Sequence, residues 1–330
     1  MELQIGGWHF PNGLWAAPLQ GITEDPIFRM MCRASGAELT FVPMIDIGEY
    51  CRHPDTGRTL LEHAQAEKPF AIQLLGNSKS PTKEFFDQIT SFDVELVDLN
   101  LCCAARSALT TNMGGALLRK LGKAADFATS VVKYSPVPVI AKMRSGWSRE
   151  FNYGSQIGKE LEQSGIAAIT AHGLSVKAKY SGKSNPRLIK VIREAVRIPV
   201  IANGDIKTSE DALTVLDATG AAGISIGRAS IGNPYVFSEL SSKSSHFFNQ
   251  LNREIQPLWL LLDYVQTGKA YTIGSEFSRA KHFLYVHLKD ASKKQILREQ
   301  LDSIQNVGDF LTYFIPKYPV LAQHPLAKTQ

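Results

Sequence analysis

Eight apolar runs, rich in β-branched residues, recur along the first two thirds of the chain. Most of them are continuous rather than alternating, which is the pattern of strands covered on both faces. We therefore predict eight buried strands, at Leu14–Pro18, Glu38–Pro43, Phe70–Leu75, Val94–Asn100, Val137–Arg144, Ala167–His172, Ile198–Asn203 and Ala222–Gly227.

Segments with the apolar spacing of amphipathic helices lie between these runs. The clearest are Ile27–Ser35, Thr82–Thr90, Leu117–Tyr134, Tyr153–Ser164, Pro186–Val196 and Ser209–Thr219. The last of them follows a capping signal, Thr208 with Asp211 three residues later. Eight strands alternating with helices predict an α/β fold, a (β/α)8 TIM barrel. A doubly wound open sheet is the alternative, but that fold usually has fewer strands.

The strand pattern ends after Leu240, and helical spacing replaces it. Helices are predicted at Leu251–Val265, Glu276–Lys289, Lys293–Ile304 and Val307–Phe314, and they should pack as a small helical bundle. The tail from Pro316 contains proline and lysine, and we expect it to be frayed. The sequence thus predicts two domains, a barrel at residues 1–240 and a helical domain at 241–330.

The charge of the chain is unevenly distributed. Its 330 residues are 44% hydrophobic and 20% charged, which is ordinary globular composition, and the net charge is +5. Residues 241–330 hold 11 Lys and Arg against 7 Asp and Glu, a net of +4. A basic segment beside a nearly neutral body suggests a polyanionic partner such as RNA. The competing interpretation is an ordinary solvated surface.

The four cysteines are too few for a disulfide framework in a chain of this length. They stand at Cys32, Cys51, Cys102 and Cys103 and match no CxxC zinc pattern, so we expect no metal. No apolar run is long enough to span a bilayer, and the N-terminus lacks the pattern of a signal peptide. We expect a cytoplasmic protein without a membrane partner, and a monomer.

Polar residues follow the predicted strands, at the end where the active sites of (β/α)8 barrels lie. They are Gln73, Asn100, Cys103, Lys142, Arg144, His172, Asn203, Gly204, Asp205, Gly227 and Arg228. The glycine-containing loops after the last two strands are where such barrels tend to bind phosphate. Arg228 could add a bidentate contact to that phosphate. The sequence predicts a site for a phosphate-bearing ligand, with a lysine, a histidine and a cysteine nearby. A buried, inert cysteine is the alternative for Cys103.

Six motifs in order along the barrel resemble those of the tRNA-dihydrouridine synthase family. Residues 17–29 are similar to its opening A-P-M-x-G-x-T-D-x-x-F-R, and residues 72–76 contain its Q-L-x-G. The stretches 140–147, 170–173, 199–206 and 226–234 resemble its V-K-x-R-x-G-W, V-H-G, P-V-I-x-N-G-D-I and I-G-R-G-A-x-G-N-P patterns. The stretch from Arg279 through Lys281 to His282 also looks like a basic patch of that family's helical domain.

The chain departs from the family in two places. The family pattern N-x-G-C-P appears here as Asn100-Leu-Cys-Cys-Ala, so that Cys102 takes the place of glycine and Ala104 that of proline. The G-x-A-L-L motif follows the family cysteine by eleven residues, and Gly114 stands in that register to Cys103 rather than Cys102. Leu174 occupies the place of an arginine, which removes a cation near the site.

The resemblance implies FMN in the barrel mouth and NADPH as a transient reductant. It implies cofactor contacts at Ala17, Pro18, Leu19, Gln73, Lys142, His172, Asn203, Gly204, Asp205, Gly227 and Arg228, and substrate contacts at Asn100, Arg144 and Tyr180. RNA contacts are expected at Arg279, Lys281 and His282. The implied reaction is reduction of the uracil 5,6 double bond in tRNA. A Cys103 thiol, with an ordinary pKa of about 8.5, suits the general acid that protonates C5.

Two other functions stay open from the sequence. One is a flavin oxidoreductase acting on a small molecule, which would share the phosphate loops and Lys142 but would not need a basic helical domain. The other is an RNA-binding protein that has kept the fold and lost the chemistry, a hypothesis motivated by the altered cysteine loop and by Leu174.

Overall fold

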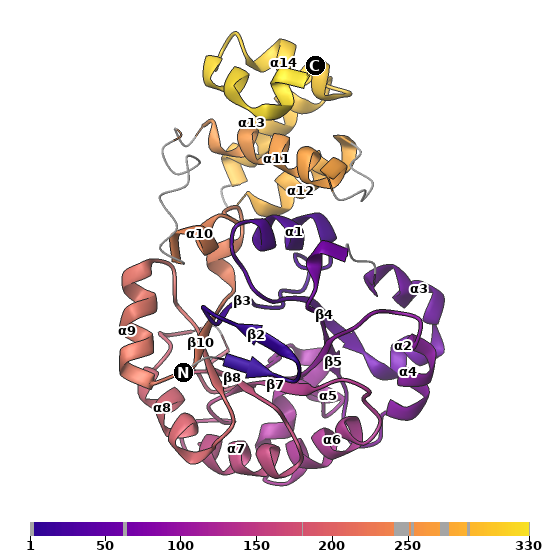
Figure 1. Ribbon diagram of the computed structural model, residues 1–330, viewed down its shortest axis with the longest axis vertical. Helices are drawn as coiled ribbons and strands as arrows, with labels where there is room; N and C mark the ends of the chain where they lie inside the picture. The colour runs from indigo at the N-terminus through magenta and orange to yellow at the C-terminus, as the bar shows by residue number, and fades with distance from the viewer. Residues whose placement is uncertain are drawn as a thin grey trace.

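The computed structural model shows a barrel with a helical domain stacked on one side of it (Figure 1). It describes residues 3–61, 65–179, 181–240, 251, 254–270, 277–288 and 291–329. The predicted domain boundary at residue 240 adjoins residues 241–250, which lie outside the described residues, and it stays a prediction.

Eight parallel strands form the barrel, one for each predicted run. They are β3 (Leu14–Ala16), β4 (Thr40–Asp46), β5 (Phe70–Leu75), β6 (Leu96–Leu101), β7 (Val139–Arg144), β8 (Ile169–His172), β9 (Val200–Asn203) and β10 (Gly223–Ile226). The sheet runs in the order β3-β10-β9-β8-β7-β6-β5-β4. Ala16 N–H donates to the Leu39 carbonyl at 2.9 Å and Glu38 N–H to that of Leu14 at 2.7 Å, and these bonds join β3 to the start of β4. The prediction of a (β/α)8 barrel is confirmed.

The helices around the barrel follow the predicted spacing closely. They include α1 (Pro26–Ala34), α4 (Thr82–Ile89), α7 (Gly154–Gln163), α8 (Pro186–Ala195) and α9 (Ser209–Thr219), with the short α2 (Ile47–Arg52), α3 (Pro54–Arg58), α5 (Arg106–Thr110) and α10 (Val236–Leu240). The prediction of one long helix at Leu117–Tyr134 is wrong. It is divided into η3 (Gly114–Arg119) and α6 (Lys123–Val132), because Gly122, at φ +83°, turns the chain between them.

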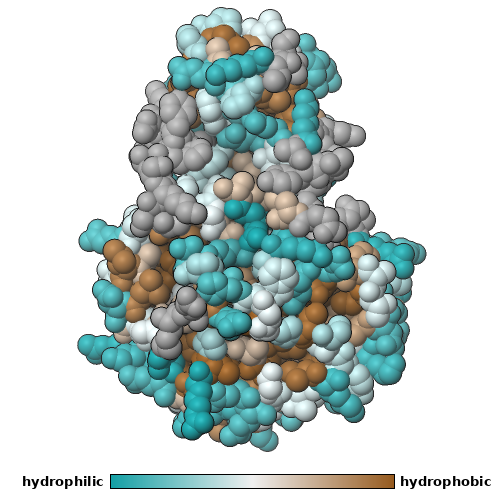
Figure 2. All heavy atoms as spheres, in the orientation of Figure 1, coloured by the Kyte–Doolittle hydropathy of each residue, from teal (hydrophilic) through white to brown (hydrophobic). Residues whose placement is uncertain are grey.

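A hairpin that the sequence analysis did not predict covers the N-terminal end of the barrel (Figure 1). Its strands are β1 (Leu3–Ile5) and β2 (Trp8–Phe10), paired antiparallel. The Phe10 ring meets Trp15 edge-on at 5.6 Å inside the barrel. Figure 2 shows this face, with hydrophilic residues around its rim and hydrophobic ones nearer its centre. Because this end is closed, the site lies at the opposite mouth.

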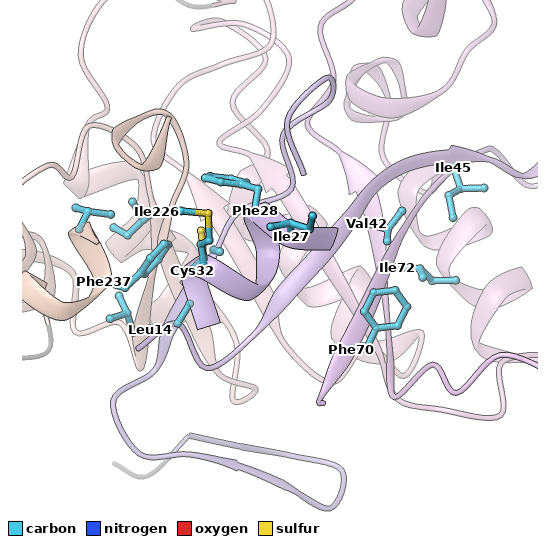
Figure 3. Close-up of a cluster of buried hydrophobic side chains, with 14 of the residues drawn as sticks. Leu14, Ile27, Phe28, Cys32, Val42, Ile45, Phe70, Ile72, Ile226 and Phe237 are labelled. Atoms are coloured by element: carbon cyan, nitrogen blue, oxygen red, sulfur yellow. The ribbon is translucent and has the colours of Figure 1, made fainter. Parts of the chain in front are cut away.

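Helix α1 carries part of the main core, between the barrel wall and the helical domain. Asp25 caps the helix by accepting from Ile27 N–H at 2.9 Å, and Pro26 stands at its first position. Cys32 is fully buried among apolar side chains of α1, β3 and α10 (Figure 3). Burial holds its pKa well above the ordinary value, so Cys32 is an inert core residue.

The helical domain consists of α11 (Gln256–Ala270), α12 (Phe277–His287), α13 (Ala291–Leu301) and α14 (Val307–Phe314) in the described residues. It packs on α1, where the Phe28 ring lies 4.6 Å from His287. The Asp25 carboxylate also accepts from Tyr264 O–H at 2.8 Å and pairs with Arg279 at 3.5 Å. One carboxylate thus serves both the barrel and the helical domain.

The prediction of a frayed C-terminal tail is wrong. Residues after Pro316 form the short helices η6 (Pro319–Gln323) and η7 (Pro325–Thr329). Leu321 and His324 are fully buried, and His324 Nε2 makes a hydrogen bond of 3.0 Å to Asp263 Oδ1. The prediction relied on the proline and lysine content and overlooked the apolar residues of this segment, which pack against the helical domain. No helix among the described residues is both long and apolar enough to cross a bilayer.

Candidate active site

A cavity of about 1550 Å³ lies at the carboxyl ends of the barrel strands and extends to the helical domain. Parallel strands bring the residues that follow them to one edge, so the predicted side chains gather here. Those that line the cavity are Ala17, Pro18, Leu19, Gln73, Asn100, Cys103, Lys142, Arg144, His172, Asn203, Gly204, Asp205, Gly227 and Arg228. Tyr180 lies outside the described residues.

The loop after β3 forms one wall of the cavity and is held from below. Ala17 N–H donates to the Ile226 carbonyl at 2.8 Å, which continues the barrel sheet into the loop. The buried Arg29 donates to the Thr23 carbonyl at 2.8 Å and pairs with the buried Glu67. Two paired charges beneath the loop therefore fix the wall that carries Ala17, Pro18 and Leu19.

Lys142 places a buried cation at the centre of the site. Its side chain is on β7, its residue is only 8% exposed, and Nζ donates to Asn203 Oδ1 at 3.0 Å. Nζ also lies 3.5 Å from Cys102 Sγ. Among the described residues no carboxylate lies within ion-pair distance of this ammonium. A buried cation with neutral partners favours a ligand that carries or develops negative charge.

His172 is a neutral hydrogen-bond donor. Burial first, and then the cations of Lys142, Arg144 and Arg228, lower the pKa of its imidazole to about 2. Its Nδ1 accepts from Leu174 N–H at 3.2 Å, so Nε2 carries the proton. Nε2 lies beside Gly204, where an added Cβ would come within 3.0 Å of it.

The loops after β9 and β10 form a cradle for an anion. Gly204 has φ +117°, which favours glycine, and the N–H groups of Gly204 and Gly227 have no hydrogen-bond partner among the described residues. Arg228 pairs with Asp205 at 3.0 Å, and the other oxygen of Asp205 accepts from Ser184 N–H at 2.7 Å. A carboxylate repels phosphate, so we assign Asp205 to orienting Arg228.

The cysteine loop keeps a defined shape without the glycine and proline of the family pattern. Asn100 Oδ1 accepts from the N–H groups of Cys102 at 3.0 Å and Cys103 at 2.8 Å. Gly115 N–H donates to the Cys103 carbonyl at 2.9 Å. Cys102 does not have a positive φ, so its backbone does not require glycine. The loop is thus fixed from both sides by hydrogen bonds.

The environment of Cys103 keeps its sulfur protonated. Burial raises the pKa of this thiol above its ordinary value and outweighs the opposing influence of the Ala105 N–H and, after it, of the Arg144 guanidinium. A raised pKa disfavours the thiolate at neutral pH, so Cys103 is poorly suited to act as a nucleophile. It is well suited to give a proton.

Arg144 holds two loops at the rim of the cavity. Its Nε donates to the Cys102 carbonyl at 3.0 Å, and its Nη1 donates to the carbonyls of Ser175 at 3.1 Å and Lys179 at 2.6 Å. Lys179 has φ +51°, uncommon for a residue with a side chain, and it lines the cavity. The sequence analysis missed Lys179, although it directly precedes Tyr180, which was predicted as a substrate contact.

The basic stretch of α12 does not present one continuous charged surface. Lys281 Nζ donates to the carbonyls of Leu301 at 3.2 Å and Ile304 at 3.0 Å, so it caps the end of α13. Arg279 pairs with Asp25, and with His282 it lines a separate cavity of about 280 Å³. Contact of these three residues with RNA stays a prediction.

The fold and site define a (β/α)8 barrel with a cavity at the carboxyl ends of its strands whose cations and N–H groups favour an anionic ligand. The chain belongs to the dihydrouridine synthase family: the family model "Dihydrouridine synthase (Dus)" matches residues 15–314. The resemblance drawn from the motifs is confirmed.

Curated relatives support this assignment, and a solved structure shares the fold. The tRNA-dihydrouridine synthase B of Pasteurella multocida (strain Pm70) is 35% identical over 240 residues, which cover 73% of this chain and 72% of that protein. The tRNA-dihydrouridine synthase B of Pectobacterium carotovorum is 29% identical over 94% of this chain and 97% of its own length. Histamine dehydrogenase from Rhizobium sp. 4-9 has a TM-score of 0.54 at 11% identity and covers 84% of this chain and 52% of that chain, a likeness of fold.

Proposed function

We propose that this chain is a flavin-dependent tRNA-dihydrouridine synthase, which reduces the C5–C6 double bond of specific uridines in tRNA with NADPH as reductant. Membership of the family and the names of its curated relatives support the reaction and the RNA. The observation that carries the proposal is the Cys103 thiol, which burial keeps protonated and which lines the same cavity as the buried Lys142.

The residues at the mouth fit FMN. The N–H groups of Gly204 and Gly227, which lack a partner in the part of the chain that the structure describes, would hold its phosphate together with Arg228. Gln73 and Lys142 would bind the flavin ring, where the ammonium favours negative charge. His172 Nε2–H would donate to the ribityl chain or the ring, and Ala17, Pro18 and Leu19 would form the wall beside it. When bound, FMN supplies the hydride that reaches C6 of the uracil.

Cys103 completes the reduction by donating a proton to C5. The thiol is available at neutral pH because its pKa is raised. Asn100 holds the N–H groups of Cys102 and Cys103 and fixes where the loop carries the thiol. Arg144 holds the Cys102 carbonyl from the other side. These contacts orient the acid before substrate arrives, which is how positioned groups lower a barrier.

The target base must leave its stack to reach this cavity, as it does for other base-modifying enzymes. Lys179, Lys207 and Lys293 line the cavity and would meet the RNA backbone near the extruded nucleotide. The net charge of +4 over residues 241–330 fits the same partner. Substrate contact by Tyr180, the cytoplasmic location and the monomeric state stay predictions.

The test starts from purified protein and its visible spectrum. We expect a yellow protein that NADPH bleaches, and a gain of two daltons on a uridine when unmodified tRNA is added, measured by mass spectrometry. Bleaching without a change in tRNA would favour a small-molecule substrate. A colourless protein that binds tRNA would favour an RNA-binding function without chemistry.

A further inference from the structure

A buried carboxyl group lies beneath the site and has no part in the reaction as described above. Asp98 is on β6, two residues before Asn100, and is 1% exposed. In the barrel it stands opposite Gln73 of β5, in register. The side chain of Gln73 is equally hidden, at 2% exposed. A carboxyl group in such a place needs a structural or functional reason, because its burial is costly.

Hydrogen bonds lead from Asp98 to the catalytic cysteine without a gap. Gln73 Nε2 donates to Asp98 Oδ2 at 2.7 Å, and Asn100 Nδ2 donates to Gln73 Oε1 at 2.8 Å. Asn100 Oδ1 then accepts from the N–H groups of Cys102 at 3.0 Å and Cys103 at 2.8 Å. Every bond points the same way, toward the carboxyl group.

Both ends of the chain of hydrogen bonds set this direction. An amide side chain can present either its oxygen or its nitrogen to a neighbour, so Gln73 and Asn100 could in principle both be reversed. A carboxylate can only accept, so Gln73 must turn its nitrogen toward Asp98 and its oxygen toward Asn100. Asn100 must then turn its oxygen toward the cysteine loop, where two N–H groups require an acceptor.

We propose that Asp98 is a positioning residue for Cys103, acting through the oriented amides of Gln73 and Asn100. The proposal rests on the proposed function only for the role of Cys103, because the hydrogen bonds exist in the protein alone. Burial raises the pKa of Asp98 to about 7, against the opposing influence of Gln73 and Lys142. When Asp98 is protonated, a proton on Oδ1 leaves Oδ2 free to accept from Gln73, and the two loop N–H groups still require the oxygen of Asn100, so the orientation of the amides is the same in both charge states.

The competing explanation is that Asp98 only compensates the charge of Lys142. Two substitutions separate the explanations. Asp98→Asn removes the charge and keeps an acceptor for Gln73, whereas Asp98→Leu removes both at similar volume. Thr170→Val is the control: Thr170 is a buried polar residue of the same barrel, opposite Lys142 in register, and lies outside the chain of hydrogen bonds.

The first readout needs neither cofactor nor RNA. Hydrogen exchange of the backbone N–H groups of Cys102 and Cys103, followed by mass spectrometry, reports directly on their bond to Asn100. We expect exchange about tenfold faster in Asp98→Leu, which corresponds to the loss of one hydrogen bond, and little change in Asp98→Asn or Thr170→Val. Alkylation of Cys103 by iodoacetamide, mapped by peptide mass, should change in Asp98→Leu alone.

The second readout is the single-turnover rate of dihydrouridine formation. We expect Asp98→Leu to lose at least about tenfold and Asp98→Asn to retain most of the rate. Equal defects in both variants would show that charge is what matters and would overturn the proposal, as would unchanged exchange in Asp98→Leu. If Asp98→Leu does not fold, Gln73→Leu interrupts the same chain and must give the same exchange pattern.

The two proposals fail in different ways. A wild-type protein that leaves tRNA unchanged would contradict the proposed function, yet hydrogen exchange would still decide whether Asp98 orients the cysteine loop. A wild-type protein that modifies tRNA while Asp98→Leu keeps both normal exchange and normal turnover would overturn the role of Asp98 alone.

Discussion

Gly114 packs directly against Cys103. A Cβ at position 114 would lie 3.0 Å from the Cys103 Cβ and 3.2 Å from its carbonyl oxygen, and Gly114 has φ +58°. Both the conformation and the tight space disfavour a side chain, and the next residue, Gly115, bonds to the Cys103 carbonyl. The glycine pair thus supports the loop that carries Cys103.

Gly114→Ala should therefore impair turnover as well as stability. We expect a loss of about 1–2 kcal/mol of unfolding free energy from the positive φ, and a lower rate of dihydrouridine formation because the Cys103 loop is displaced. Gly122→Ala is the matched control, since Gly122 has φ +83° with open space around it. Urea unfolding and single-turnover assays compare the two. A Gly114→Ala enzyme with the rate of the control would contradict the contact.

The two adjacent cysteines should behave differently. Cys103→Ala is expected to keep its yellow colour and lose most of its turnover on native tRNA, because the proton donor is gone. Cys102→Ala should keep most of its turnover, since Cys102 contributes its backbone to Asn100 and Arg144. The reverse result, with Cys102→Ala inactive and Cys103→Ala active, would show that the assignment of the acid is wrong.

The pH profile of the RNA half-reaction should follow the raised pKa of Cys103. The protonated thiol is the active form, so the rate stays level at low pH and falls as the thiol ionises. Because burial raises the pKa, the fall begins above the ordinary value of about 8.5. The rate of dihydrouridine formation between pH 7 and 10 measures this. A fall that begins below pH 8 would indicate a different acid.

His172 should make the protein sensitive to acid. Its folded pKa of about 2 lies below the unfolded value of about 6.5, so the unfolded chain binds the proton first as the pH falls. The stabilisation is complete above the unfolded pKa and is lost below it, by at most about 1.4 kcal/mol per pH unit. Urea unfolding of wild type and His172→Asn between pH 7 and 5 tests this. We expect a shallower dependence in His172→Asn.

Lys179 should contribute to RNA binding more than its neighbour Lys177. Both are exposed and two residues apart, but only Lys179 lines the cavity. Lys179→Ala should weaken tRNA binding and lower the slope of log affinity against log salt by about one, as expected for one lost phosphate contact. Lys177→Ala is the control in the same binding titration. Equal effects of both substitutions would contradict a specific contact at the cavity.

The barrel could be predicted because buried parallel strands leave a strong signal. All eight apolar runs became strands, and α9 was predicted with its observed bounds because the capping box of Thr208 and Asp211 marks its start. The residues at the strand ends followed from the topology. Contacts between loops could not be predicted from the topology. The bond from Asn100 to the cysteine loop and the position of Lys179 depend on the geometry of individual side chains and loops.

The failures have identifiable causes. The break before α6 depends on a single glycine at φ +83°, which helical periodicity does not reveal. The tail contains proline and lysine, yet Leu321 and His324 are fully buried, and His324 bonds to Asp263 of α11. The sequence also did not reveal that the Lys281 ammonium is bound by two carbonyl groups of its own domain, and its contact with RNA stays a prediction.

Asp25 links the two halves of the molecule. The same carboxylate begins α1 and binds Tyr264 and Arg279 of the helical domain. Separating the two halves would break the contacts of Asp25 with Tyr264 and Arg279, so these contacts help to fix the distance between the barrel mouth and the helical domain. A fixed distance selects the substrate by its shape. We expect the uridine that reaches Cys103 to be the one that the folded RNA presents at that distance from the helical domain.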